Sequence, residues 1–358
     1  MCSRVRQVLL VTVAVVPMVA AWAGGEVVRA PSFMIESTAR QRVVAVLGFS
    51  IHCPDLVARE WSLAVAAAPE LPSQSHVKTT LTPTGVAVRE AGALNRGMLT
   101  LRLPVKKKDD STRLSVQVTY EATLHARTLR PAAGGEAGKP LRLSSADRER
   151  FTAERGDCDF KHERFKKWLK DEGLQRGRDE GDLDFARRAF LTLRQKLTYE
   201  YRDEMDRKAS TVCFDGKSDC GGLAGLLVAV LRSNGVPART LYGRWAQSAV
   251  PNDRINQTPY YQWHVKAECF ADGVGWVPMD LSAGIVFDRS AEGLRFFGQD
   301  AGDFLTFHVD THLQVNSGLF GLQTISNMQG PAWWAAGQGS TKPVRIEQSW
   351  SVKAEPQK

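Results

Sequence analysis

Three residues in the second half of the chain have the types and spacing of a nucleophilic acyl-transfer site. Cys220 precedes two glycines, His264 lies 44 residues further on, and Asp280 follows after another 16 residues. A histidine can take the proton of a cysteine thiol, and a carboxylate can orient and stabilise the resulting imidazolium. The thiolate would attack a carbonyl carbon and form a thioester. Cys220, His264 and Asp280 are therefore the candidate catalytic residues.

The segment around Cys220 predicts a buried helix that begins at the cysteine. Apolar residues follow at helical spacing and Asn234 with Gly235 ends the pattern; these apolar residues are Leu223, Leu226, Leu227, Val230 and Leu231. Peptide dipoles at a helix N-terminus favour a thiolate, and backbone N–H groups near Gly221 and Gly222 would stabilise an oxyanion. The structural alternative is a cysteine that packs beside a core helix as a small apolar side chain.

His264 and Asp280 lie on either side of a predicted β-hairpin. A strand over 260–269 is followed by the turn Ala271-Asp272-Gly273 and by a returning strand over 274–279. If these three residues form the loop, with Gly273 left-handed, His264 lies directly opposite Asp280 with Cβ atoms about 5 Å apart. A two-residue loop would place them on opposite faces unless a bulge restored the register.

The elements that position these residues change from helices to strands along the chain. Residues 145–208 are rich in charge, and Phe185, Ala189 and Leu193 recur at helical spacing. Strand patterns return from 236 to 280. Helices followed by strands within one domain indicate an α+β fold, and we expect this catalytic domain to span 145–315.

Residues 24–140 predict a separate domain of strands. Apolar residues alternate with polar ones, as in Leu99, Leu101 and Leu103 and again from Leu114 to Tyr120, which is typical of half-buried strands. An immunoglobulin-like β-sandwich is the expected form. The small-residue stretch 131–140 predicts a linker, and residues 316–358 predict terminal strands and a tail.

Four short motifs in the same order resemble the transglutaminase-like superfamily over about residues 185–315. They are Asp-Cys-Gly-Gly at 219–222, Asn-Gly-Val-Pro-Ala-Arg at 234–239, Trp-His-Val at 263–265 and Gly-Trp-Val-Pro-Met-Asp at 275–280. The resemblance implies a papain-like core, with helices packed on an antiparallel sheet, that uses Cys220, His264 and Asp280 without a cofactor or metal. It also implies an aromatic or amide oxyanion donor, for which Tyr199, Tyr201 and Gln195 are candidates, and Trp263 as a substrate contact.

The chain departs from this pattern near the nucleophile. Many members carry Arg-Gly or Lys-Gly before the acidic residue, whereas this chain has Gly216-Lys217-Ser218-Asp219. Cys213 lies seven residues before Cys220, and a bridge between the two would silence the nucleophile. The remaining cysteines of the mature chain, Cys53, Cys158 and Cys269 with Cys213, allow three pairings or none.

The N-terminus has the layout of a secretory signal peptide. Arg4 and Arg6 precede an apolar run over 8–21, and Ala21-Trp22-Ala23 offers a cleavage point. We therefore exclude residues 1–23 from the fold and expect a secreted or periplasmic protein without an integral span after cleavage. An uncleaved membrane anchor is the alternative; the run is shorter than the about 20 residues of a spanning helix.

Composition and charge narrow the class of function. The chain has 358 residues, 43% hydrophobic residues and a formal net charge of +8, without a basic block interleaved with aromatics. This composition is globular and does not favour nucleic-acid binding. His308 and His312 share a predicted strand face rather than a metal-binding helix face, so no metal is expected.

These observations predict an exported cysteine enzyme that acts on proteins or peptides, including peptides of the cell envelope. Hydrolysis and transfer to an amine run through the same thioester, and the sequence leaves the choice between them open. The alternative is a catalytically silent module of the same fold that serves binding or assembly.

Overall fold

The protein, seen here in a computed structural model, is described for residues 32–132, 141–202 and 204–357. The predicted signal peptide, residues 1–23, lies outside these residues. Helices and mostly antiparallel strands are mixed, and the buried side chains form two hydrophobic clusters. Among the described helices, none combines the length and the apolar character needed to cross a bilayer.

The first cluster lies between two antiparallel sheets built mainly from the N-terminal strands. One sheet has the order β14-β6-β1-β19 with β3 added to β6, and the other has the order β18-β2-β5-β4. Their bounds are β1 Phe33–His52, β2 Leu56–Ala66, β3 Gln74–Thr82, β4 Val86–Arg89, β5 Gly97–Pro104, β6 Arg113–Pro131, β14 Gln299–Asp300, β18 Ala332–Gly339 and β19 Arg345–Pro356. Alternate residues of β1, from Val43 to Ile51, are buried, as the period-two pattern of a half-buried strand requires.

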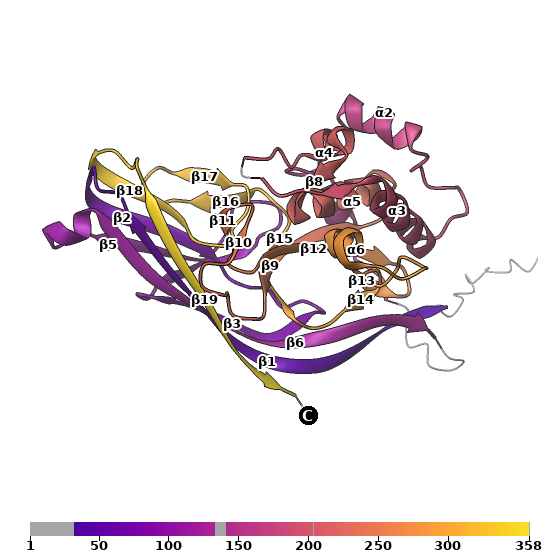
Figure 1. Cartoon of the computed structure of the whole chain (residues 1–358), viewed down its shortest axis with the longest axis horizontal. Helices are drawn as coiled ribbons and strands as arrows, with labels where there is room; N and C mark the ends of the chain where they lie inside the picture. Colours follow the sequence, from indigo (N-terminus) through magenta and orange to yellow (C-terminus); the bar gives the residue numbers. More distant parts are fainter. Residues whose placement is uncertain (1–31, 133–140, 203, 358) are drawn as a thin grey trace, which may run out of the picture. The chain divides into compact units, whose positions relative to one another are not determined.

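The second cluster packs helices against the four-stranded sheet β13-β12-β9-β15 (Figure 1). The strands are β9 Ala238–Trp245, β12 Trp263–Ala271, β13 Gly275–Met279 and β15 Phe304–Val309. The helices are α1 Ser145–Thr152, α2 Glu163–Asp171, α3 Asp182–Lys196, α4 Ala209–Asp215, α5 Cys220–Ser233 and α6 Leu281–Phe287. The predicted helix after Cys220 is thus confirmed, and α5 packs directly on β9 and β12.

The last part of the chain completes the sheets of the first part. β19 pairs antiparallel with β1, and β18 pairs antiparallel with β2. Between β15 and these strands lies a small hairpin of β16 Leu313–Asn316 and β17 Leu322–Ile325. The 3-10 turn Lys108–Ser111 joins β5 to β6. The predicted linker falls mostly on residues 133–140, outside the described residues.

A buried ion network connects the two clusters. Arg127 of β6 contacts Glu268 of β12 at 2.6 Å and Asp300 of β14 at 3.1 Å, and all three side chains are buried. Arg239 adds a second cation to Glu268 at 2.7 Å, and Lys266 adds one to Asp300 at 3.4 Å. Each charge of this network therefore has an opposite partner, which offsets the cost of burying it.

The network makes stability depend on acidic pH. Although burial alone would raise it, the charges of Lys266 and Arg127 lower the pKa of Asp300 from 3.8 to about 2. Its stabilising contribution is therefore complete above the unfolded pKa and is lost as the pH falls through the folded value. Between pH 6 and pH 3 we expect Asp300 to account for a loss of about 1 kcal/mol in the free energy of unfolding.

Denaturant titrations at both pH values measure this loss. In Asp300→Asn the difference between pH 6 and pH 3 should shrink by that amount, whereas Asp109→Asn, which changes an exposed carboxylate, should keep the parental difference. An unchanged difference in Asp300→Asn would show that this carboxylate does not carry the acid sensitivity.

The contact between β9 and β15 leaves no room for a side chain at Gly243. A Cβ built there would overlap the carbonyl oxygen of Leu305, at the irregular pairing where β15 shifts register between Thr306 and His308. We expect Gly243→Ala to lower the free energy of unfolding by about 3 kcal/mol, because the overlap is with backbone. Gly225→Ala in α5, with nothing nearer than 3.9 Å, is the matched control and should be neutral or stabilising. Equal thermal melting of the two variants would contradict this.

Candidate active site

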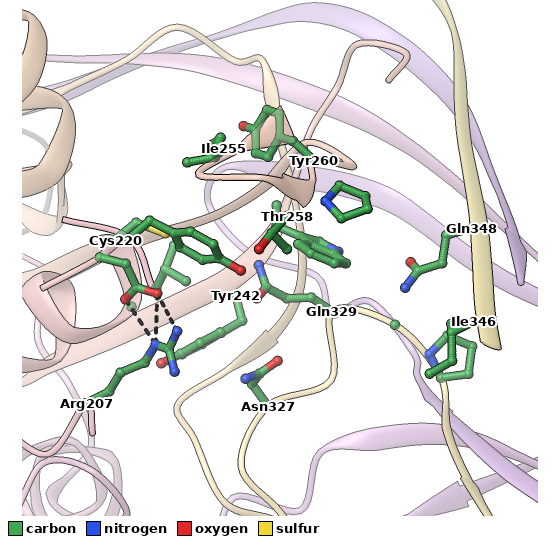
Figure 2. Close-up of a pocket in the computed structure, with 18 of the residues that line it drawn as sticks. Arg207, Cys220, Tyr242, Ile255, Thr258, Tyr260, Asn327, Gln329, Ile346 and Gln348 are labelled. Atoms are coloured by element: carbon green, nitrogen blue, oxygen red, sulfur yellow. Dashed lines mark hydrogen bonds and ion pairs between the residues drawn. The ribbon is translucent and has the colours of Figure 1, made fainter. Parts of the chain in front are cut away.

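Cys220 is the first residue of α5, and its neighbour Asp219 holds the beginning of this helix. The Asp219 carboxylate accepts a hydrogen bond from the Gly222 N–H at 3.1 Å, as an N-capping residue does. Arg207 donates hydrogen bonds to the same carboxylate from Nε and Nη2, the shortest at 2.6 Å (Figure 2). A bidentate guanidinium fixes the plane of the carboxylate. The segment that carries Cys220 is thus held in one orientation.

The two glycines after Cys220 have different surroundings. Gly221 lines the cavity beside Cys220. Gly222 is buried, and a Cβ there would overlap the Ser218 hydroxyl. Gly222 is therefore not among the residues that line the cavity, and its small size serves the packing of α5 against Ser218.

His264 and Asp280 form a buried hydrogen bond, His264 Nε2 to Asp280 Oδ2, at 2.7 Å. The predicted register behind this contact is wrong. Ala271 pairs with Gly275, so the loop is Asp272-Gly273-Val274 and the ladder is shifted by two residues from the predicted one. Because side chains alternate with a period of two, a shift of two keeps both residues on one face. The pair is diagonal rather than directly opposite.

Asp280 is fixed from its other side by the helix that follows it. Its Oδ1 accepts hydrogen bonds from the Ser282 hydroxyl and the Ala283 N–H, both at 3.0 Å, and Asp280 is the N-cap of α6. Although burial opposes it, the charge and hydrogen bond of His264 lower the pKa of Asp280. Asp280 therefore stays ionised and can stabilise a protonated imidazole.

The imidazole of His264 is also held by its ring faces and its backbone. Trp245 stacks on it with ring centroids 4.4 Å apart, and Phe304 meets it edge-on at 5.9 Å. Gln329 donates a hydrogen bond from Nε2 to the His264 carbonyl oxygen at 2.8 Å. With Nε2 bonded to Asp280, Nδ1 is the nitrogen left for proton transfer.

The thiol of Cys220 lies against β12, next to the position of His264. A hydrogen bond from the backbone N–H of Val265 lowers its pKa, yet burial, followed by the carboxylates of Asp219 and Asp280, raises it far more. These surroundings therefore disfavour the thiolate form of Cys220. This differs from the expectation that the helix N-terminus favours a thiolate, because burial and two carboxylates outweigh the helix dipole.

A cavity of about 370 Å³ opens at Cys220. Tyr199 of β7 (Thr198–Tyr199), Tyr201 and Trp263 line it, as does Tyr242 of β9, whereas the third oxyanion candidate, Gln195, is exposed on α3 and is not part of the lining. Burial raises the pKa of Tyr199 and of Tyr242. Both phenols therefore keep their protons at neutral pH and can act as hydrogen-bond donors.

A short hairpin covers one side of this cavity. Strands β10 Arg254–Ile255 and β11 Thr258–Pro259 are joined by Asn256 and Gln257, both with positive φ, as the tightest hairpins require. The Asn256 side-chain amide donates a hydrogen bond to the Tyr201 carbonyl oxygen at 2.5 Å. Ile255, Thr258 and Pro259 thereby become part of the cavity wall.

The far wall comes from the C-terminal segment, which sequence reasoning did not connect with the site. Its residues in the lining are Asn327, Gln329, Gly330, Pro331, Trp333, Ile346 and Gln348. Figure 2 shows Asn327, Gln329 and Gln348 facing the space in front of Cys220. No local motif marks these residues. Only the long-range pairing of β18 and β19 brings them to the site.

All five cysteines that the structure describes are unpaired. A Cys213–Cys220 bridge is therefore absent, and burial raises the pKa of Cys213 to about 11. Cys53, Cys158 and Cys269 are buried, whereas Cys220 is half-buried at the cavity. Among the described cysteines, Cys220 is thus the most accessible to a substrate.

His308 is occupied in the packing of the cavity wall. It is buried against Tyr242, with ring centroids 5.0 Å apart; Nδ1 donates to the Asp310 carbonyl oxygen, and Nε2 accepts from the Met328 N–H. Burial lowers its pKa to about 3. Within the described ranges, no group of three His, Cys, Asp or Glu side chains could hold a metal ion.

The segment that contains Cys220, His264 and Asp280 matches the model of a known protein family. Residues 172–281 match the family model of the transglutaminase-like superfamily, which confirms the predicted resemblance for that segment. No match is found among curated protein sequences.

Two solved structures are among those similar to the chain. A protein from Cytophaga hutchinsonii proposed to be a cysteine protease shares 12% identity, with a TM-score of 0.50 over 89% of this chain and 100% of that one. The periplasmic domain of TgpA from Pseudomonas aeruginosa shares 13% identity, with a TM-score of 0.35 over 69% of this chain and 93% of that domain. At these identities, the likeness to the Cytophaga protein concerns the fold alone.

Proposed function

Starting from the match of residues 172–281 to the transglutaminase-like superfamily, we propose that Cys220, His264 and Asp280 form the centre of a cysteine acyl-transfer enzyme. The observation that carries the proposal is the buried hydrogen bond from His264 Nε2 to Asp280 at 2.7 Å, beside a thiol that contacts Val265. An oriented imidazole next to a half-buried thiol is the arrangement that activates a nucleophile.

The reaction follows from these positions. His264 takes the thiol proton at Nδ1, and the sulfur attacks the carbonyl carbon of an amide. The Gly222 N–H donates to Asp219, so the backbone N–H groups of Cys220 and Gly221 and the Tyr199 hydroxyl are the oxyanion donors in this scheme. The imidazolium then protonates the leaving amine as the C–N bond breaks, which leaves a thioester on Cys220. Attack by water or by an amine releases the acyl group and returns the proton to the thiol.

The proposed substrates are proteins or peptides, including those of the cell envelope, and the proposed location is secreted or periplasmic. The cavity of about 370 Å³, lined by aromatic and amide side chains, suits a peptide segment. The signal-like pattern of residues 1–23 supports export. Water reaches any exported site, which favours hydrolysis, and an amine that fills the cavity would instead give transfer.

The raised pKa of Cys220 favours the second candidate function, a catalytically silent module used for binding or assembly. A neutral thiol without an effective base is an ordinary buried cysteine. The two functions differ in whether His264 takes the proton of Cys220 below neutral pH.

Alkylation by iodoacetamide tests the proposed function directly. At about pH 6.5, we expect Cys220 to react at least about tenfold faster than free cysteine, of which only about 1% is thiolate at that pH. Peptide mapping by mass spectrometry locates the label, and the buried Cys213 serves as an internal control that should react slowly. Reaction of Cys220 no faster than free cysteine would favour the silent module.

For residues 24–140, we propose the immunoglobulin-like β-sandwich that the strand pattern predicts. The two antiparallel sheets share one hydrophobic cluster, which supports a sandwich arrangement. Strands β18 and β19 belong to the same two sheets, so any such sandwich includes residues from the C-terminal segment.

A further inference from the structure

A buried arginine without an acidic partner lies behind the far wall of the cavity. The Arg244 side chain is fully buried, and no carboxylate of the described chain forms an ion pair with it. Its guanidinium donates instead to neutral acceptors: the Gln329 carbonyl oxygen at 2.7 Å, the Tyr261 carbonyl oxygen at 3.2 Å and the Gln348 Oε1 at 2.8 Å. Burial lowers its pKa to about 9, so it stays charged at neutral pH.

The charge lies close to the space that a substrate would fill. A Cβ on Gly330, which lines the cavity, would be 3.7 Å from Arg244 Nη2, and the Arg244 guanidinium lies 5.5 Å from the centre of the Trp263 ring. One layer of residues therefore separates the guanidinium from the cavity. Because Arg244 is fully buried, its charge is screened less than that of an exposed side chain at the same distance would be.

Arg244 also fixes the direction of the Gln348 amide. A guanidinium can only donate hydrogen bonds, so the amide must turn its oxygen towards Arg244. Its Nε2 then points away, and this NH₂ group has no hydrogen-bond partner among the residues that the structure describes. The wall thus presents an unpaired donor that a buried cation polarises.

The other charges of the lining cancel each other. Arg207 and Asp219 are its only charged members, and they form the ion pair that holds the beginning of α5. Burial raises the pKa of Tyr199, Tyr242 and Tyr260, and the lining has no other acidic or basic side chain apart from Tyr201 and the Cys220 thiol. The carboxylates of Asp219 and Asp280 act at Cys220, whereas no charged residue of the lining other than this ion pair offsets Arg244 at the wall formed by Gln329 and Gln348.

We propose that the wall formed by Gln348 and Gln329 in front of Arg244 is a subsite for a carboxylate of the peptide substrate. The proposal rests on the proposed function and specifies its substrate class: an acyl donor that carries a free carboxylate on the Arg244 side of the cavity. The carboxylate accepts hydrogen bonds from the Gln348 NH₂ and meets the field of the buried guanidinium, which is the geometry of a charge-assisted site. Specificity is then shared between the nucleophile on α5 and the C-terminal segment.

Alkylating probes of graded length test the subsite without a known substrate. N-iodoacetyl-glycine, -β-alanine and -4-aminobutyrate are each compared with the matching carboxamide, and the rate of S-alkylation at Cys220 is measured by mass spectrometry. In every case sulfur displaces iodide and the thiol loses its proton, so only the distal group differs. For each chain length, the ratio of the acid rate to the amide rate at Cys220 is divided by the same ratio for free cysteine. We expect this normalised acid-to-amide ratio to be about ten for at least one chain length.

The isosteric variant Gln348→Glu places a carboxylate next to Arg244 and should lower the normalised acid-to-amide ratio about tenfold. The new ion pair between Glu and Arg244 should preserve the fold. Gln338→Glu, at the exposed far end of β18, changes the net charge equally and should keep the parental ratio. Equal ratios for protein and free cysteine at every length, or equal losses in both variants, would overturn the subsite alone. Failure of Cys220 to react with either member of any pair would overturn the proposed function and the subsite with it.

Discussion

Replacing His264 by glutamine is expected to slow the alkylation of Cys220 by iodoacetamide about 100- to 10,000-fold near neutral pH, the range that a positioned base contributes. The effect should be large because burial raises the pKa of the Cys220 thiol. Without the imidazole, the proton has no acceptor inside the site. The rate should then follow the small thiolate fraction of a buried cysteine and rise only at strongly alkaline pH.

The pH profile separates this effect from a change in folding. In the parent protein, the rate should reach a plateau once the thiol has transferred its proton to His264, whereas His264→Gln should show no plateau below pH 9. His52→Gln on β1 is the matched control, because it removes an imidazole far along the chain from the site. If His264→Gln kept the parental profile, His264 would not be the base, and the proposed mechanism would be wrong.

Replacing Arg127 by methionine is expected to lower the free energy of unfolding by about 3–5 kcal/mol, the cost of removing one partner from a buried ion network. Glu268 would keep only Arg239, and Asp300 would keep only the more distant Lys266. Both carboxylates are buried, so water cannot replace the lost cation. The loss should appear as a lower midpoint in urea titrations followed by circular dichroism.

A second arginine of β6 provides the control for this measurement. Arg130 pairs with Glu36 at 2.9 Å, but both side chains are partly exposed, and such surface pairs contribute about 0–1 kcal/mol. Arg130→Met should therefore change the urea midpoint little. Similar midpoints for Arg127→Met and Arg130→Met would mean that the buried network does not hold β6 against β12 and β14.

The sequence was most informative where local spacing determines the structure. The apolar stripe after Cys220 predicts α5 and its beginning at Cys220, because the helical pattern depends only on residues within about two turns of one another. The prediction that His264 and Asp280 meet on one face is confirmed by their hydrogen bond. The hairpin register was wrong by two residues, because Gly273 and Gly275 both tolerate positive φ and allow more than one loop.

The missing parts of the site depend on contacts that local patterns cannot show. Arg207 holds Asp219 from twelve residues upstream, and Gln348 reaches the cavity from more than one hundred residues beyond Cys220. The upward shift in the pKa of the Cys220 thiol was also unpredictable from its position at the beginning of a helix. It depends on burial and on the carboxylates of Asp219 and Asp280, which only the packed structure brings together.

The pairing of β19 with β1 and of β18 with β2 has a consequence for the order of events during synthesis. A ribosome makes Cys220, His264 and Asp280 well before it makes the residues between Asn327 and Gln348, which form the far wall of the cavity. The nascent chain therefore carries the proposed nucleophile before the cavity in front of it is complete. Closure of the sheets across about three hundred residues is slow compared with local helix formation. The cavity wall is thus complete only after residue 348 has left the ribosome, and the proposed substrate specificity cannot arise before then.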